Sequence, residues 1–250
     1  DENLKVVFPA NLEGEDLSDD IAKGEAHNLK KGFADATPEN SDDFRDAVEK
    51  GQSVVLTADV NLELENIRIA KGEQVELDLG GKTITIGYKN SGADTRHEYA
   101  IDNYGTLKIK NGTIKARGVN NYGTLIIERD AVIYALDSNG GACVWNEGGT
   151  LTINGGSFYA PESNTATEGA SLISNTNGTV IINGGIFNTS SEVYAIVNRS
   201  GNMTINNCTL TSTRAGVAIL SGTLEINGGT FTNNGSAYAL YAANGTLNIK

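Results

Sequence analysis

The stretch GTLTINGGSF at residues 149–158 decides the fold, because copies of it recur along most of the chain. Four segments match it closely: GTLKIKNGTI at 105–114, GTVIINGGIF at 178–187, GNMTINNCTL at 201–210 and GTLEINGGTF at 222–231. A looser copy begins at Gly123, and GTLNIK at 245–250 matches the first half of the pattern. The first glycines of these segments are 18, 26, 29, 23, 21 and 23 residues apart. Such a period is typical of solenoid proteins.

The copies also agree position by position. The residues two after each first glycine are all apolar: Leu107, Leu125, Leu151, Val180, Met203, Leu224 and Leu247. The residues four after it are all isoleucine: Ile109, Ile127, Ile153, Ile182, Ile205, Ile226 and Ile249. A third apolar column follows nine or ten after the glycine: Ile114, Ile133, Phe158, Phe187, Leu210 and Phe231. Alternation with period two predicts short strands that bury one face.

A further apolar segment precedes many of the glycines, as in AIDNYG at 100–105 and YAIVNRSG at 194–201. Each repeat therefore contains two or three short strands with no helical stretch between them. Two weaker coils lie upstream, where Val75 and Leu77 fit a repeat starting at Glu73, and Val54 and Leu56 fit one starting at Gln52. The sequence thus predicts an all-β fold, a right-handed parallel β-helix of about nine coils over residues 52–250. We expect it to continue beyond Lys250.

The outward-facing positions support this stacking. Glu76 and Asp78 in one coil precede Lys108 and Lys110 in the next, and Glu128 follows in the third. Stacking would place negative beside positive beside negative charge, which is favourable between neighbouring strands. Later coils carry asparagine at the position of Glu128: Asn154, Asn183, Asn206 and Asn227. These residues predict a hydrogen-bonded amide ladder along the axis.

Residues 41–51, SDDFRDAVEKG, predict a short helix that caps the first coil. Ser41 is the expected N-cap, Gly51 the expected stop, and Phe44 and Val48 lie on the face toward the coil. Residues 1–40 do not repeat and are acidic. They are a solvated leader, a part of the cap, or an attachment segment for a larger assembly.

Composition excludes several classes. The 250 residues carry a net charge of −12, and 14 acidic against 6 basic residues lie within 1–50. A pI near 4.6 argues against nucleic acid as a partner. Because no run of about 18 apolar residues occurs, we expect no membrane insertion. Cys143 and Cys208 lack the spacing of a metal or redox motif and are interpreted as buried apolar residues. We expect no metal and no cofactor.

SDDFRDAVEKGQSVVLTADVNL at 41–62, IAKGEQVELDLGGKTIT at 69–85 and the coils after them resemble the pectate-lyase-like β-helices of gut-bacterial surface proteins. Similar repeats occur in fibre proteins of the phages that infect those bacteria. The resemblance covers residues 41–250 and implies the fold. It implies little about activity, because the matching motifs belong to the scaffold.

The alternative of a polysaccharide lyase or glycosidase requires clustered ionisable groups. Residues 138–250 hold only five Glu, three basic residues, no Asp and no His, so we expect no catalytic residues there. The insertion 87–99 and nearby Asp102 are the remaining place for such chemistry, with Asp94 and His97 as the groups to test. The candidate ligand-binding residues are polar groups of this insertion and aromatic residues near coil turns: Arg96, His97, Tyr99, Tyr104, Tyr122 and Trp145. Tyr104 and Tyr122 should stack, with Trp145 near them one coil on; such rings either form a structural ladder or hold a sugar.

These observations favour a non-enzymatic rod on a virion, such as a phage fibre or decoration protein, that displays a binding surface. A bacterial cell-surface adhesin is the second interpretation, and a carbohydrate-active enzyme the third. The expected partners are a virion or cell-surface anchoring protein held by residues 1–40 and a cell-surface glycan. We also expect a homotrimer, exposed at the virion or cell surface.

Overall fold

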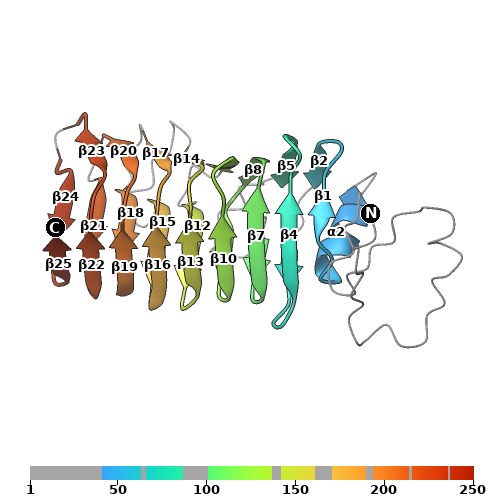
Figure 1. Ribbon diagram of the computed structural model, residues 1–250, viewed down its shortest axis with the longest axis horizontal. Helices are drawn as coiled ribbons and strands as arrows, with labels where there is room; N and C mark the ends of the chain where they lie inside the picture. Colours follow the sequence, from blue (N-terminus) through green and yellow to red (C-terminus); the bar gives the residue numbers. More distant parts are fainter. Residues whose placement is uncertain are drawn as a thin grey trace, which may run out of the picture.

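The structure, a computed structural model, describes residues 41–62, 66–86, 101–136, 142–160, 171–189, 194–213, 216–235 and 237–250. Along these residues the chain forms a right-handed parallel β-helix of nine coils with a short helix at its first coil (Figure 1). Three sheets run the length of the rod, and strands of successive coils are neighbours in each. The predicted fold class is confirmed.

The first sheet has nine strands, one from each coil. They are β1 (Val54–Val55), β4 (Gln74–Asp78), β7 (Thr106–Lys110), β10 (Thr124–Ile127), β13 (Thr150–Ile153), β16 (Gly178–Ile182), β19 (Gly201–Ile205), β22 (Thr223–Ile226) and β25 (Thr246–Ile249). Leu107 pairs with Leu125, and Leu125 with Leu151, as the repeat predicts. The same register continues to Leu247. Identical positions of the repeat therefore lie above one another.

The second and third sheets have eight strands each. The second contains β2 (Val60–Leu62), β5 (Thr83–Ile86), β8 (Gly112–Ala116), β11 (Ala131–Ala135), β14 (Ser157–Tyr159), β17 (Ile186–Asn188), β20 (Thr209–Ser212) and β23 (Thr230–Asn233). The third contains β3 (Ile67–Ile69), β6 (Ile101–Asn103), β9 (Val119–Asn121), β12 (Ala142–Glu147), β15 (Ser171–Thr176), β18 (Tyr194–Asn198), β21 (Val217–Ile219) and β24 (Leu240–Ala242).

The apolar columns of all three sheets fill the interior. Phe158 and Phe187 are fully buried and stack with ring centroids 4.6 Å apart and ring planes 5° from parallel. Cys143 and Cys208 are buried free thiols, as predicted. Burial raises the pKa of each thiol to about 12, so both remain protonated at neutral pH. The interior is thus a continuous apolar column with little ionisable chemistry.

Helix α2 (Ser41–Glu49) covers the first strand of each sheet. Phe44 and Val48 are fully buried against this coil, as their four-residue spacing predicts. The helix ends at Glu49, and Gly51 beyond it has a positive φ of 74°. The Gly51 N–H donates to Val48 O and the Gln52 N–H to Ala47 O, the pattern of a Schellman C-cap. Ser41 is itself the first helical residue, and its hydroxyl donates to Asn61 O, which ties the helix to β2.

The predicted register of the first coil is wrong by two residues. Val54 pairs with Leu77, not with Val75, and the Leu56 N–H donates to Asp78 O. A shift of two leaves the same side chains facing inward, so the apolar pattern does not distinguish the two registers. The Ser53 hydroxyl accepts a hydrogen bond from the Glu76 N–H, which holds the observed register.

A buried amide ladder inside the third sheet was not predicted. Five asparagines, none of them exposed, lie one above another: Asn103, Asn121, Asn146, Asn175 and Asn198. Each of the first four donates from Nδ2 to Oδ1 of the next, at 2.7–2.8 Å. Their remaining amide hydrogens bond to carbonyls where the chain turns toward the first sheet, for example from Asn146 to Gly149 O. The ladder therefore holds the turns of successive coils together.

Candidate functional site

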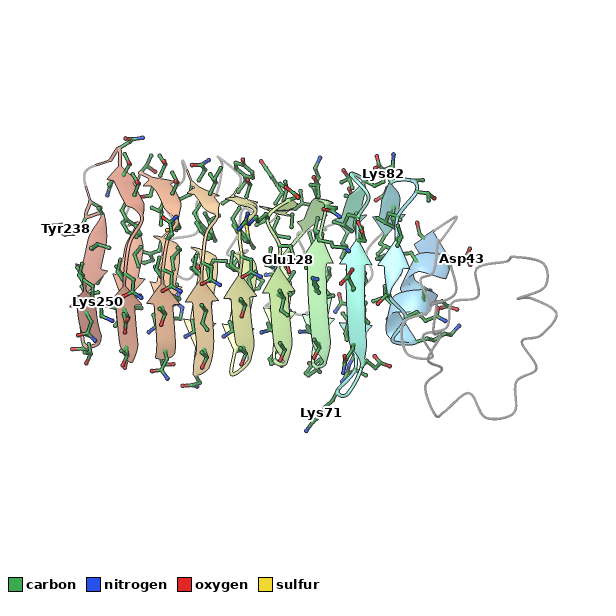
Figure 2. All side chains as sticks on the ribbon, in the orientation of Figure 1. Asp43, Lys71, Lys82, Glu128, Tyr238 and Lys250 are labelled. Carbon is green, nitrogen blue, oxygen red and sulfur yellow. The ribbon has the colours of Figure 1, made fainter. Side chains whose placement is uncertain are left out.

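The carboxylates on the outer face of the first sheet are engaged in ion pairs. Lys108 Nζ lies 3.2 Å from Glu76 and 3.7 Å from Glu128, and Lys110 Nζ lies 3.2 Å from Asp78. Lys110 also contacts Glu76. Figure 2 marks Glu128 near the middle of the rod. The predicted alternation of charge is confirmed, and the Glu128 contact runs diagonally to Lys108.

These contacts shift the ionisation of the acids. Partial burial acts to raise the pKa of Glu76, but hydrogen bonds and charge from Lys110 and Lys108 outweigh it and hold that pKa below its ordinary value. For Asp78, burial is likewise outweighed, here by hydrogen bonds from Asn111 and the Gly80 N–H and by Lys110, so its pKa is also lowered. Both groups therefore favour their charged, paired forms.

This cluster gives the protein an acid-sensitive component of stability. Because the folded-state pKa values of Glu76 and Asp78 lie below their unfolded values, the stabilisation is complete above the unfolded values, about pH 4. It is lost as the pH falls through the lowered folded values. We expect this cluster to change the thermal midpoint little between pH 6 and 8. At pH values below about 4, we expect the thermal midpoint to decrease.

Thermal unfolding at constant ionic strength, followed by circular dichroism, tests this prediction. Glu76→Gln should reduce the decrease in thermal midpoint at acidic pH. Glu49→Gln, on the exposed face of α2, should leave this decrease as in the parent. Equal decreases in the parent and the Glu76→Gln variant would contradict the prediction.

The predicted outer amide ladder is confirmed and begins at this cluster. Asn154 Nδ2 donates to the Glu128 carboxylate at 3.3 Å, and Asn183 Nδ2 donates to Asn154 Oδ1 at 3.0 Å. Asn206 and Asn227 continue the series at 2.8 Å each. The amides of this column are thereby used within the scaffold, which gives the first sheet a structural role.

Tyr104 and Tyr122 form the predicted stack. Their ring centroids are 4.7 Å apart and their planes differ by 9°. The Arg68 guanidinium lies over the other face of the Tyr104 ring, 4.7 Å from its centroid, in a cation–π contact. The three side chains come from successive coils, and both faces of Tyr104 are occupied. These contacts identify the stack as a structural ladder.

Trp145 does not extend the tyrosine column. It pairs in register with Asn120, so Glu147 is the residue that follows Tyr122. Only 7% of Trp145 is exposed, and its ring packs over Gly118, where an added Cβ would lie 3.1 Å from it. Trp145 therefore lies in the coil after Tyr122, as expected, but two residues before the position that continues the tyrosine column.

The remaining predicted residues divide into two sets. Asp102 is buried in β6, where its Oδ1 accepts a hydrogen bond from Asn120 Nδ2 at 2.7 Å. The polar residues of the insertion lie outside the described residues: Asp94, Arg96, His97 and Tyr99. The structure therefore brings Tyr104 and Tyr122 together and does not test the insertion.

A groove that the sequence did not predict lies on the outer face of the second sheet. Its volume is about 350 Å³. We call it the second-sheet groove, and its lining residues are Tyr134, Tyr159, Ala160, Asn188, Thr189, Thr211, Thr213 and Asn234. It follows the ends of strands β11, β14, β17, β20 and β23, where each coil leaves this sheet. None of these lining residues is charged.

Four of its residues form one column along the axis. Tyr134 pairs with Tyr159, Tyr159 with Asn188 and Asn188 with Thr211, in four successive coils. The two tyrosine rings stack with centroids 6.2 Å apart and planes inclined by 29°. All four are half-buried. The column therefore passes from aromatic faces to neutral hydrogen-bonding groups.

The sequence does carry a signal for this column. Tyr134 and Tyr159 directly follow Ile133 and Phe158 of the third apolar column. In a strand, the residue after an inward one faces outward. The aromatic residues predicted as candidates lie near the first glycines of the repeat, whereas these two tyrosines follow the third apolar column.

Within the described ranges, no group of three or more His, Cys, Asp or Glu side chains could hold a metal ion. Nor does any helix in this part of the chain combine the length and apolar character needed to cross a membrane. Comparisons of the chain with protein-family models, curated proteins and solved structures found no match.

Proposed function

We propose that this protein is a non-enzymatic rod on the surface of a virion, a fibre or decoration protein, that displays a binding surface for a cell-surface glycan. The second-sheet groove is the observation that carries the proposal. It presents two tyrosine rings and several neutral polar groups on strands that are hydrogen-bonded to neighbours. Sites on such a rigid scaffold lose little freedom when a ligand binds.

The first sheet supports the non-enzymatic part of the proposal. Glu76, Asp78 and Glu128 are each within 4 Å of a lysine and are used in stacking the coils. Catalysis by a carboxylate pair requires two acids to flank the reacting bond. The resemblance to pectate-lyase-like β-helices is part of the same proposal. It supports the role of the chain as a scaffold and does not by itself imply an enzymatic activity, because one fold can carry many functions.

The proposed partners are a glycan on the target cell and an anchoring protein that binds residues 1–40. The proposed assembly is a homotrimer. Light scattering after size exclusion should give three times the mass of the chain, 26.3 kDa for the 250 residues. A monodisperse monomer would contradict the trimer, while leaving glycan binding to a separate test.

The main experiment measures binding of the fluorescently labelled chain to bacterial cells. We expect saturable binding that is abolished when periodate oxidises the cell-surface glycans and is retained after the cells are treated with protease. Absence of saturable binding would contradict the proposed function. Immunogold labelling of virions and cells then separates a virion protein from the second candidate, a bacterial cell-surface adhesin.

The third candidate, a polysaccharide lyase or glycosidase, is tested by incubating the chain with pectins and host glycans. We expect no release of reducing ends and no unsaturated product. Product formation that is lost in a variant with alanine at Asp94, His97 and Asp102 would replace the proposed function with an enzymatic one.

A further inference from the structure

We propose that the second-sheet groove binds a neutral oligosaccharide that lies along the rod axis, with sugar rings against Tyr134 and Tyr159 and sugar hydroxyls bonded to Asn188 and Thr211. This inference rests on the proposed function and names the ligand class and the residues that select it.

The lining offers two kinds of contact in one column. The two tyrosine rings stack on each other and leave part of their apolar surface exposed in the groove. A pyranose ring has an apolar face of C–H groups that packs against such a surface. The amide of Asn188 both donates and accepts hydrogen bonds, as does the hydroxyl of Thr211. Sugar hydroxyls need both functions. The column therefore matches the mixed surface of a sugar chain.

The polar groups of the column are not used by the scaffold. Every asparagine of the two amide ladders bonds to a neighbouring coil. Asn188 lies instead between Tyr159 and Thr211, and neither neighbour continues an amide ladder. Among the described side chains, neither the Asn188 amide nor the Thr211 hydroxyl has a hydrogen-bond partner. Their donors and acceptors are open to a ligand.

The backbone beneath the groove does not offer a site for a peptide strand. Strands β11, β14, β17 and β20 are each paired on both sides. Addition of a peptide strand requires a free sheet edge with unpaired N–H and C=O groups. Recognition along this groove therefore depends on side chains, which favours a sugar chain over an extended peptide.

The described residues of the lining carry no charge, and such a lining favours a neutral ligand. An anionic chain would lose water on entering the groove without gaining a positive partner. The nearest charged residue of the column is Lys115, which pairs with Tyr134 from the preceding coil and is exposed outside the lining. The ion pairs of Glu76, Lys108 and Glu128 belong to the first sheet.

The direction of the ligand follows from the stacking. Tyr134, Tyr159, Asn188 and Thr211 lie on successive coils, and strands in a sheet are about 4.8 Å apart. Three such steps separate the first and last side chains. A ligand that contacts all four must therefore extend along the rod and span more than one sugar ring.

The test is affinity electrophoresis of the full chain in gels that contain dextran, mannan, galactan, β-glucan or polygalacturonate. We expect at least one neutral polysaccharide to retard the chain and polygalacturonate not to do so. Tyr159→Ala should weaken the neutral binding about thirtyfold, as for an aromatic residue at the centre of an interface. Asn188→Ala should weaken it about tenfold.

Two control variants separate the groove from its surroundings. Tyr104→Ala removes an aromatic ring of the other stack, and Lys115→Ala removes the charged side chain that pairs with Tyr134 in the same column. Both variants should bind as the parent does. Far-UV circular dichroism checks that each variant folds. If Tyr159→Ala does not fold, Thr211→Val keeps the side-chain volume while removing the hydroxyl and should weaken binding about tenfold.

The outcomes distinguish this inference from the proposed function. The inference would be overturned if the folded Tyr159→Ala variant bound the neutral polysaccharide as the parent does. It would also be overturned if the parent bound polygalacturonate more tightly than any neutral polysaccharide and this binding required Lys115. Failure of every neutral polysaccharide to retard the parent would also overturn it. If the chain binds cells and folded Tyr159→Ala binds them equally well, the groove assignment fails and the rod function stands. If binding of a neutral polysaccharide depends on Tyr159 but the chain does not bind cells, the groove assignment stands and the proposed function fails.

Discussion

An alanine at Asn146 will destabilise the protein by about 2–4 kcal/mol, whereas an alanine at Asn206 will cost less than about 1 kcal/mol. Both asparagines belong to amide ladders, but Asn146 is fully buried and Asn206 is exposed. Asn146 Oδ1 accepts from Asn121 at 2.7 Å, and its Nδ2 donates to Asn175 Oδ1 at 2.8 Å and to Gly149 O at 2.9 Å. Its removal leaves buried polar atoms on two neighbouring coils without these partners.

Water makes the difference between the two positions. When Asn206 is truncated, the freed groups of Asn183 and Asn227 lie at the surface and bond to solvent. No solvent reaches the atoms around Asn146 without opening the coil. Equilibrium unfolding in guanidinium chloride, followed by far-UV circular dichroism, measures both variants against the parent. Equal losses at the two positions would show that burial does not control the strength of the ladders.

The buried ladder is also finite, for a reason visible in the strand register. At its start, Asn103 pairs with Ile69, which offers no side-chain donor, and Asn103 Oδ1 is buried without a hydrogen bond. At its end, Asn198 pairs with Ile219, and its amide bonds to the carbonyls of Ser221 and Thr223. The ladder occupies the central coils because only these have asparagine at this position.

The fold was predictable because the repeat specifies it more than once. Leu107, Ile109 and Ile114 each begin a column whose spacing independently requires parallel stacking. The charges of Glu76 and Lys108 then confirm the register from the outer face. The first coil lacks this redundancy, since Val54 fits either of two registers with the same buried face. Its register follows from the end of α2 and from Ser53, which the apolar pattern does not include.

The groove was not predictable in the same way. Its column of Tyr134, Tyr159, Asn188 and Thr211 does not repeat one chemical type, so no search for identical positions finds it. Outward side chains are not constrained by core packing and differ from coil to coil. Trp145 shows the corresponding limit for single residues. Its place depends on a turn from Asn146 to Gly149 that is one residue longer than the turn from Asn121 to Gly123.

The second large effect is expected at the centre of the core, where Phe187→Ala will lower the free energy of unfolding by about 3–5 kcal/mol. Phe187 is fully buried, stacks on Phe158 at 4.6 Å and pairs in register with Leu210. Its loss removes apolar burial and one ring of an aromatic pair. Phe187→Leu should cost only about 1–1.5 kcal/mol, because Leu210 shows that this column accepts leucine.

A cavity at this position should also reduce the cooperativity of unfolding. In a solenoid each coil contacts only its neighbours, so Phe187 contributes to the coupling between the coils before and after it. We expect Phe187→Ala to broaden the urea transition or divide it in two. The control is Ile186→Ala, because Ile186 is the preceding residue of β17 and is 44% exposed on the outer face. This variant should lower the free energy of unfolding by less than about 0.5 kcal/mol and leave the slope of the urea transition unchanged. A single transition of parental slope in Phe187→Ala would show that coupling between coils depends on the backbone ladders and not on the stacked core.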